Sequence, residues 1–179
     1  MTLGGECDGR GAPEGSRKYF GTDAREITEF ILKGRKLIRQ QLSTKDKNKH
    51  CVVALPGMPQ FRTIRRICGM YELTGKDVSK HFDDSIGCTG DWRKAGPVYE
   101  IPFRSLIVED ICNIISAGRI IASGGDAWEV TRVIPTAALT GQAAGTAAAL
   151  AANESCGIDK VNINRLQKML SESGVLIHF

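Results

Sequence analysis

The stretch that decides the fold runs from Asn113 to Ala152 and reads NIISAGRIIASGGDAWEVTRVIPTAALTGQAAGTAAALAA. Its short apolar start at 113–118 predicts a buried strand that ends at Gly118. A polar loop follows, and Pro135 then occupies a position suited to the first turn of a long helix. Strand, turn, loop and helix in this order is the arrangement by which α/β proteins present a helix N-terminus to an anionic or electron-rich ligand.

The predicted helix is built almost entirely from small residues. Because these residues place no bulky side chain between the helix and its neighbours, the helix can pack very closely. They include Ala137, Ala138, Gly141, Ala144 and Gly145. Two interpretations are open: a ligand approaches the helix, or the helix packs tightly on a sheet with no ligand. Polar residues interrupt the segment and alanine supplies little transfer energy, so we predict a buried helix of a soluble protein and no membrane span.

Two further helices are expected. Asp23 and Glu26 have the spacing of a capping box, and apolar residues then recur at helical spacing, which predicts a helix near 24–42. The last predicted helix is capped by Asn162 and ends at Gly174.

Three upstream segments favour extended structure. The apolar run CVVALP at 51–56 predicts a short strand stopped by Pro56 and Gly57. Residues 61–73 alternate with a period of two, which predicts a strand with arginines on both faces. A helical turn capped by Thr74 follows, and the proline in VYEIPFRSL at 98–106 keeps that segment extended.

Composition and charge exclude several classes of protein. Apolar residues make up 42% of the chain and charged residues 25%, which is ordinary for a soluble domain. The net charge of +4 is scattered, so no nucleic-acid partner is expected. The start has no signal-peptide pattern, which favours the cytoplasm. The six cysteines lack zinc-ligand spacing, so they are expected to be reduced and mostly buried, and no metal site is predicted.

Four ordered blocks carry a resemblance to a known family. They are FRTIRRICGMYELTGKDV, DDSIGCTGDWRKAGPVYEIPFRSL, NIISAGR and WEVTRVIPTAALTGQAAGTAAALAA. Over roughly 18–170 the chain resembles the C-terminal half of FAD-dependent oxidoreductases of the fumarate reductase and succinate dehydrogenase flavoprotein group. In that family a substrate domain interrupts a Rossmann-like FAD domain. The resemblance implies an α/β protein, present as a mixed α+β fragment.

The domain boundaries follow from the same resemblance. Residues 1–22 are expected to be a flexible N-terminus, 23–107 part of the substrate domain, and 108–179 the closing strand and helix of the FAD domain. The nearest candidate for a dinucleotide fingerprint, Gly9 to Gly15, has the spacing G-x-G-x-x-x-G and no apolar strand before it. The chain is therefore expected to be truncated, excised or naturally split, and to bind FAD poorly alone. It would pair with the missing N-terminal half or with itself.

The resemblance also implies roles for individual residues. Gly118 and Arg119 would lie beside the ribityl or phosphate part of FAD, and Trp128 would border the flavin ring. The backbone of Pro135, Thr136, Ala137 and Ala138 would face the flavin pyrimidine, because the amides after Pro135 lack an acceptor within the helix. Arg132 would contact the carboxylate of a substrate.

Three more arginines, Arg62, Arg66 and Arg104, have the chemistry to clamp an anionic substrate. The alternative, solvated arginines at a strand edge, stays open. His81 is either a general acid or base or a residue that closes a helical turn. The resulting interpretation is part of an FAD-dependent oxidoreductase that transfers a hydride between FAD and a small, anionic organic substrate. The alternative is a non-catalytic module that pairs with another polypeptide.

Overall fold

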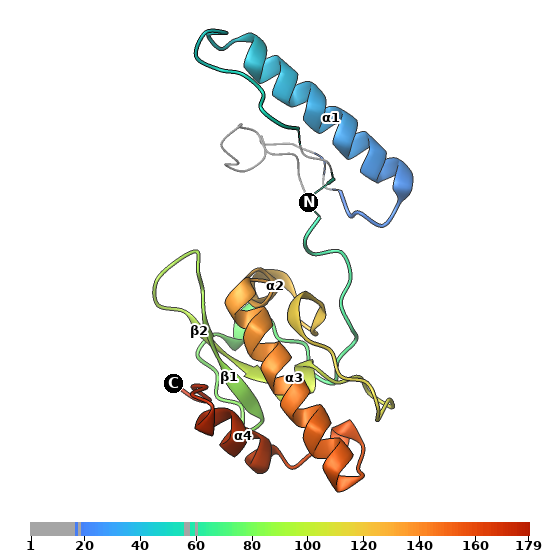
Figure 1. The fold of residues 1–179 in the computed structure, drawn as a ribbon, viewed down its shortest axis with the longest axis vertical. Helices are drawn as coiled ribbons and strands as arrows, with labels where there is room; N and C mark the ends of the chain where they lie inside the picture. The colour runs from blue at the N-terminus through green and yellow to red at the C-terminus, as the bar shows by residue number, and fades with distance from the viewer. Residues whose placement is uncertain (1–16, 18, 56–57, 60) are drawn as a thin grey trace. The chain divides into compact units, whose positions relative to one another are not determined.

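The computed structural model describes residues 17, 19–55, 58–59 and 61–179, and the candidate fingerprint at Gly9 to Gly15 lies outside them. The chain divides into two compact units, Met1–Ile64 and Arg65–Phe179 (Figure 1). The expected boundary between 107 and 108 concerns the domains of the resembled family, and it stays a prediction.

The first unit contains one long helix, α1 (Ala24–Ser43), which confirms the prediction of a helix near 24–42. The Asp23 carboxylate accepts hydrogen bonds from the backbone N–H groups of Arg25 and Glu26, at 2.7 and 3.4 Å. The Glu26 carboxylate accepts from the amides of Phe20 and Gly21, at 2.9 and 3.2 Å. Glu26 therefore fixes the chain that leads into the helix.

The second unit is a mixed α+β fold. Strand β1 (Ser85–Gly90) pairs antiparallel with β2 (Val98–Pro102). Helices α2 (Gly125–Thr131), α3 (Ile134–Glu154) and α4 (Ile163–Glu172) follow. Among the described residues the sheet has these two strands only. The helix predicted to begin near Pro135 and the one capped by Asn162 are confirmed, but α2 was expected to be a loop.

The core of the second unit lies between α3, α4 and the hairpin (Figure 1). Its α3 side is made of small residues such as Ala143 and Ala147, both fully buried. They lie against large apolar side chains, among them Ile86, Ile101 and Leu166. Because alanine fills little space, the axis of α3 can lie near the sheet, so the expected close packing is confirmed.

A bulge in β1 also allows this close approach. The strand register shifts between Ser85 and Cys88, and Gly87 has a φ of +141°. A Cβ at Gly87 would lie 2.8 Å from Leu139 Cδ1 and 2.9 Å from Val175 Cγ1. Glycine is therefore required here both for its backbone conformation and for the contact with α3.

Three segments that were predicted to be strands do not form strands. Residues 61–73 form only single bridges, from Gly69 to Val108 and from Leu73 to Ser123. Segment 113–118 makes one bridge, between Ile115 and Ile107. The described residues 51–55 have no strand. A strand needs consecutive ladder hydrogen bonds with one partner, and the bridges of 61–73 and 113–118 are isolated.

Other expectations are confirmed. Thr74 and Asp77 form a capping box around the turn at Gly75–Asp77. Strand β2 lies within the segment that Pro102 was expected to hold extended. Among the described helices, none is both long and apolar enough to cross a membrane. The five described cysteines are free, but Cys51, Cys68 and Cys112 are exposed, so the expectation of mostly buried cysteines is wrong.

Candidate functional site

The turn at Gly118 lies directly beside the first turns of α3. Gly118 has a φ of +72° and begins a 3₁₀ turn that extends to Ile120. Its backbone N–H donates a hydrogen bond to Thr140 Oγ1 at 2.9 Å. A Cβ at Gly118 would lie 3.8 Å from the Cβ of Ala137. The two predicted cofactor segments, at 118–119 and 135–138, therefore come together.

The N-terminus of α3 has no side-chain cap among the described residues. Val133 occupies the N-cap position, and its carbonyl accepts the amide of Ala137 at 2.9 Å. The expectation that the Ala137 amide points outward is therefore wrong. Pro135 has no N–H, which leaves the amides of Ile134 and Thr136 without a backbone acceptor in the described part of the chain. These amides give the helix end a partial positive charge.

A surface hollow of about 310 Å³ borders this helix end. Its lining comes from three places in the second unit: the start of α3, strand β1 and the segment after α4. The residues are Cys88, Thr89, Pro135, Thr136, Ala138, Leu139, Gln142, Val175 and Leu176. The volume is at the lower end of the range for small-molecule sites. Burial raises the pKa of the Cys88 thiol to about 11, so this sulfur is protonated at neutral pH and is a poor nucleophile.

Trp128 links two other predicted site residues. Its indole Nε1–H donates to the backbone carbonyl of Arg119 at 2.8 Å. The Arg66 guanidinium carbon lies 5.9 Å from the centre of the Trp128 ring, within range of a cation–π contact. Arg66 is also paired with Glu72 at 2.7 Å. Trp128 therefore connects the Gly118 turn to an arginine from the segment before β1.

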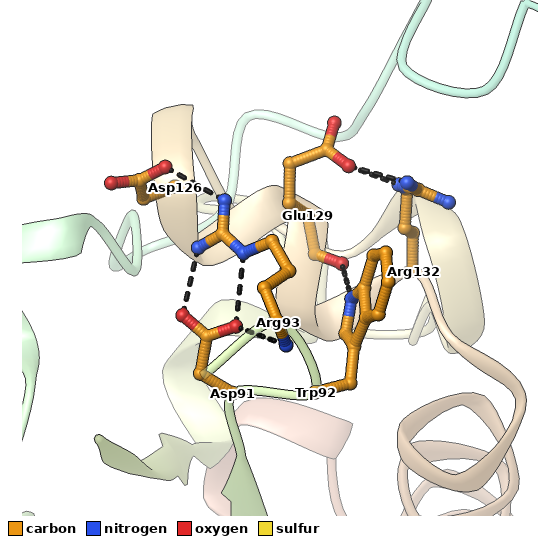
Figure 2. Close-up of polar contacts among 6 residues, drawn as sticks. All are labelled: Asp91, Trp92, Arg93, Asp126, Glu129 and Arg132. Atoms are coloured by element: carbon orange, nitrogen blue, oxygen red, sulfur yellow. Dashed lines mark hydrogen bonds and ion pairs between the residues drawn. The ribbon is translucent and has the colours of Figure 1, made fainter. Parts of the chain in front are cut away.

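Arg132 belongs to a network of polar contacts around α2 (Figure 2). Its guanidinium binds the Glu129 carboxylate through Nε, at 2.8 Å, and through Nη2. The indole of Trp92 donates to the Glu129 backbone carbonyl at 3.1 Å. The loop after β1, which contains Trp92, therefore contacts Glu129, the residue that binds Arg132.

Arg93 binds two carboxylates, one within its own loop after β1 and one on α2, as Figure 2 shows. Its guanidinium binds Asp91 at 2.9 and 2.8 Å and Asp126 at 3.0 Å. The hydrogen bonds from Arg93 lower the pKa of the Asp91 carboxyl to about 2. Asp91 is thus ionised at neutral pH, and the Arg93–Asp126 ion pair holds the loop after β1 against α2.

Arg104 lies apart from these contacts. It forms a two-point pair with Asp84, at 2.9 and 3.0 Å, and stacks 5.4 Å from the centre of the Tyr71 ring. Arg62 belongs to the other compact unit. The expectation that Arg62, Arg66, Arg104 and Arg132 bind an anionic substrate stays a prediction. The three in the second unit each have a carboxylate partner in this chain.

A model of one protein family matches most of the chain. Its description is FAD dependent oxidoreductase, and the match covers residues 14–170. The chain belongs to this family. A search of curated proteins and a search of solved structures gave no match. The narrower likeness to the fumarate reductase group stays a prediction.

FAD is the cofactor that defines this FAD-dependent oxidoreductase family. The residues beside the Gly118 turn fit part of such a group. Ala137 and Ala138 are small, the end of α3 is without a side-chain cap among the described residues, and a hollow adjoins it. A flat, electron-rich ring edge can approach such a helix end closely.

The carboxylate partners of two candidate site residues, Arg132 and Arg104, were not predicted from the sequence. Glu129 and Arg132 have the i, i+3 spacing of a helical ion pair, which would have indicated their contact had α2 been predicted. The pair of Asp84 and Arg104 joins two turns that are distant in sequence, so no local pattern indicates it.

Proposed function

We propose that this chain supplies the flavin-facing part of an oxidoreductase that transfers a hydride between FAD and a small, anionic organic substrate. The observation that supports this most directly is the Gly118 turn, which is hydrogen-bonded to α3 beside a helix end without a side-chain cap. When bound, FAD would supply the hydride chemistry, and the protein would orient the reacting groups.

The first turn of α3 would stabilise negative charge on the ring edge that it faces. A helix N-terminus carries about half a positive charge and favours an anion by about 0.3 to 1 kcal/mol. The Thr136 amide would contribute most, because Pro135 has no N–H and the Ala137 amide is used within the chain. Thr136 itself is held by its buried hydroxyl, which contacts Thr89 Oγ1 at 2.8 Å.

Arg132 is the best candidate for the substrate carboxylate. Its side chain is 14% exposed, and Glu129 engages Nε and Nη2. Within the described residues, Nη1 has no hydrogen-bond partner, so this edge of the guanidinium is open to a ligand. Glu129 would act as a positioning residue. Arg66, Arg104 and Arg62 remain proposed substrate ligands, although Arg104 would have to exchange its two-point contact with Asp84.

Arg119 and Trp128 would border the cofactor on the other side of the turn. The hydrogen bond from the Trp128 indole fixes the carbonyl of Arg119 and leaves the guanidinium of Arg119 exposed. An exposed guanidinium next to Gly118 is better suited to bind a phosphate of FAD than to contact a buried ribityl hydroxyl.

A second candidate function is a module that is inactive alone and pairs with another polypeptide. The observation that favours it is exposed apolar surface in the second unit, where Ile134 is 85% exposed and Ile120 and Ile114 are each 49% exposed. The partner would be a polypeptide that supplies another part of an FAD domain, or a second copy of this chain. The free cysteines support a reducing, cytoplasmic setting.

The test is a titration of the chain with FAD into the millimolar range, followed by flavin fluorescence, for Ala138→Val and Ala149→Val. Both residues are exposed on α3, so the two changes have the same effect on helix propensity, but only Ala138 lines the hollow. We expect weak binding to the unaltered chain and several-fold weaker binding to Ala138→Val alone. Equal binding by the two variants would contradict the proposed site. A clean monomer at high concentration would count against the second candidate.

A further inference from the structure

Three side chains from distant parts of the sequence meet at one edge of the β1–β2 hairpin. His81 precedes β1, Glu100 lies within β2, and His178 lies in the segment after α4. One potential ligand atom from each lies within 4.8 Å of the others. The Glu100 side chain is 2% exposed, whereas the two histidines are partly open to solvent.

Both imidazoles direct the same nitrogen at one carboxylate oxygen. Glu100 Oε1 lies 3.4 Å from His81 Nδ1 and 3.0 Å from His178 Nδ1. The other oxygen, Oε2, accepts the backbone N–H of Phe82 at 2.8 Å, which fixes the carboxylate. Although His178 Nδ1 is buried and close to Oε1, its alignment gives no hydrogen bond, and it has no other partner among the described residues. A buried polar atom without a partner is costly.

We propose that His81, Glu100 and His178 bind a divalent transition-metal ion, with Zn²⁺ as the best match. Two imidazole nitrogens and one carboxylate oxygen are a ligand set that Zn²⁺ accepts at about 2.0 to 2.2 Å. In a tetrahedral site with such bonds, neighbouring ligand atoms lie about 3.3 to 3.5 Å apart. The observed separations of 3.0 and 3.4 Å are close to this value. An ion there would give His178 Nδ1 a partner and neutralise the buried Glu100.

The surroundings already hold the ligands in place. The hydroxyl of Ser85 donates to the Ile177 carbonyl at 2.7 Å, and the amide of Cys88 donates to the Leu176 carbonyl at 3.0 Å. These bonds position His178 beside β1. On the outer side, His81 Nε2 lies 3.5 Å from Asp83 Oδ1, and carboxylates commonly orient metal-bound histidines in this way. The fourth position would be filled by water, because both histidines are partly exposed.

No sequence pattern indicates this site. The ligands are far apart along the chain, and the cysteines and histidines lack the short spacings of known zinc motifs. The proposal is also independent of FAD, because none of the three residues lines the hollow at the start of α3.

The test is isothermal titration of the chain with ZnCl₂, after its exposed cysteines have been alkylated to remove competing thiolates. We expect one Zn²⁺ per chain, and an affinity at least about tenfold weaker in both His81→Gln and His178→Gln. The matched control is His50→Gln, which alters the one histidine of the chain outside the proposed site. His50 is exposed in the other compact unit, 3.2 Å from the Asp46 carbonyl, so its loss should leave the affinity unchanged.

Two further measurements check that the variants fold and that the ion is bound by the proposed ligands. His81 is 63% exposed, so His81→Gln should fold, and circular dichroism checks this. Replacement of Zn²⁺ by Co²⁺ should give visible ligand-field bands that disappear in the double variant of His81 and His178. No binding at millimolar Zn²⁺, equal loss in His50→Gln, or full binding by the double variant would each overturn the proposal, leaving two histidines that only flank a buried carboxylate.

Discussion

The two long helices of this protein differ in their amphipathic pattern and in how many of their residues are buried. Helix α1 has an apolar stripe, a side-chain N-cap and, among the described residues, no buried member. Helix α3 has little amphipathic pattern and no side-chain cap in the described part of the chain, yet seven of its residues are buried. An amphipathic pattern therefore predicts that a helix forms, but it does not predict how completely its neighbours cover it.

The physical cause is the partner that each helix meets within its own unit. The apolar side of α1 contacts single aromatic rings, such as Phe61 against Phe30 at 4.7 Å between centroids, and leaves a hollow beside Met58. Helix α3 meets a hairpin and α4, and its small residues let all three approach. Four predictions test this difference, from the largest expected effect to the smallest.

Truncation of one leucine in each helix should separate the two environments most clearly. Leu150→Ala in α3 removes a side chain that is 2% exposed and should lower the free energy of unfolding by about 2 to 5 kcal/mol. Leu37→Ala in α1 removes a half-buried side chain and should cost less than half as much. Urea unfolding, followed by circular dichroism, measures both. Equal losses would show that α1 is covered as fully as α3.

The docking of α3 on the hairpin should depend on Gly87. Gly87→Ala places a Cβ 2.8 Å from Leu139 Cδ1 at a φ of +141°, and should destabilise the second unit by about 1 to 3 kcal/mol. Gly90→Ala in the same strand is the control, because a Cβ there would have no atom within 4 Å. Thermal unfolding compares the two. If Gly90→Ala were equally harmful, the close approach of α3 would not be the reason.

Low pH should lower the stability of the second unit, because it protonates Asp91. Hydrogen bonds from Arg93 lower the pKa of this carboxyl from an ordinary value of about 4 to about 2. Its contribution is therefore fully present above about pH 4 and is lost as the pH falls from about 4 to 2. In Asp91→Asn, unfolding midpoints measured at pH 5 and pH 2.5 should differ less than in the unaltered chain. The exposed pair of Glu29 and Lys33 on α1 should contribute little, so Glu29→Gln is the control.

The smallest effect should be a gain in stability at Gly141 of α3. This glycine is exposed, and a Cβ there would have no atom within 4 Å. Gly141→Ala should therefore stabilise the helix by about 0.5 to 1 kcal/mol, through the lower backbone entropy of the unfolded chain.

The same substitution would also show whether the exposed face of α3 contacts a partner. A variant that is more stable alone but associates less would indicate that the exposed side of α3 is an interface.

The sequence alone determined the features that arise within short segments. The positions of α1, α3 and α4 follow from side-chain caps, Pro135 and apolar spacing, because each helix is stabilised by bonds between residues a few positions apart. The capping box at Thr74 and the extended segment at Pro102 are equally local. The ordered motifs were also sufficient to indicate an FAD-dependent oxidoreductase, which the family match confirms.

Only the tertiary structure decided which distant residues meet. Segments 61–73 and 113–118 have strand-like sequences, but a strand also requires one partner along its whole length, and here the bridges are isolated. The pairing of Arg104 with Asp84, the contact of Trp128 with Arg119, and the meeting of His81 with His178 depend on the folded chain in the same way. Local patterns fix where helices begin and end, whereas contacts across the fold depend on how all the elements pack.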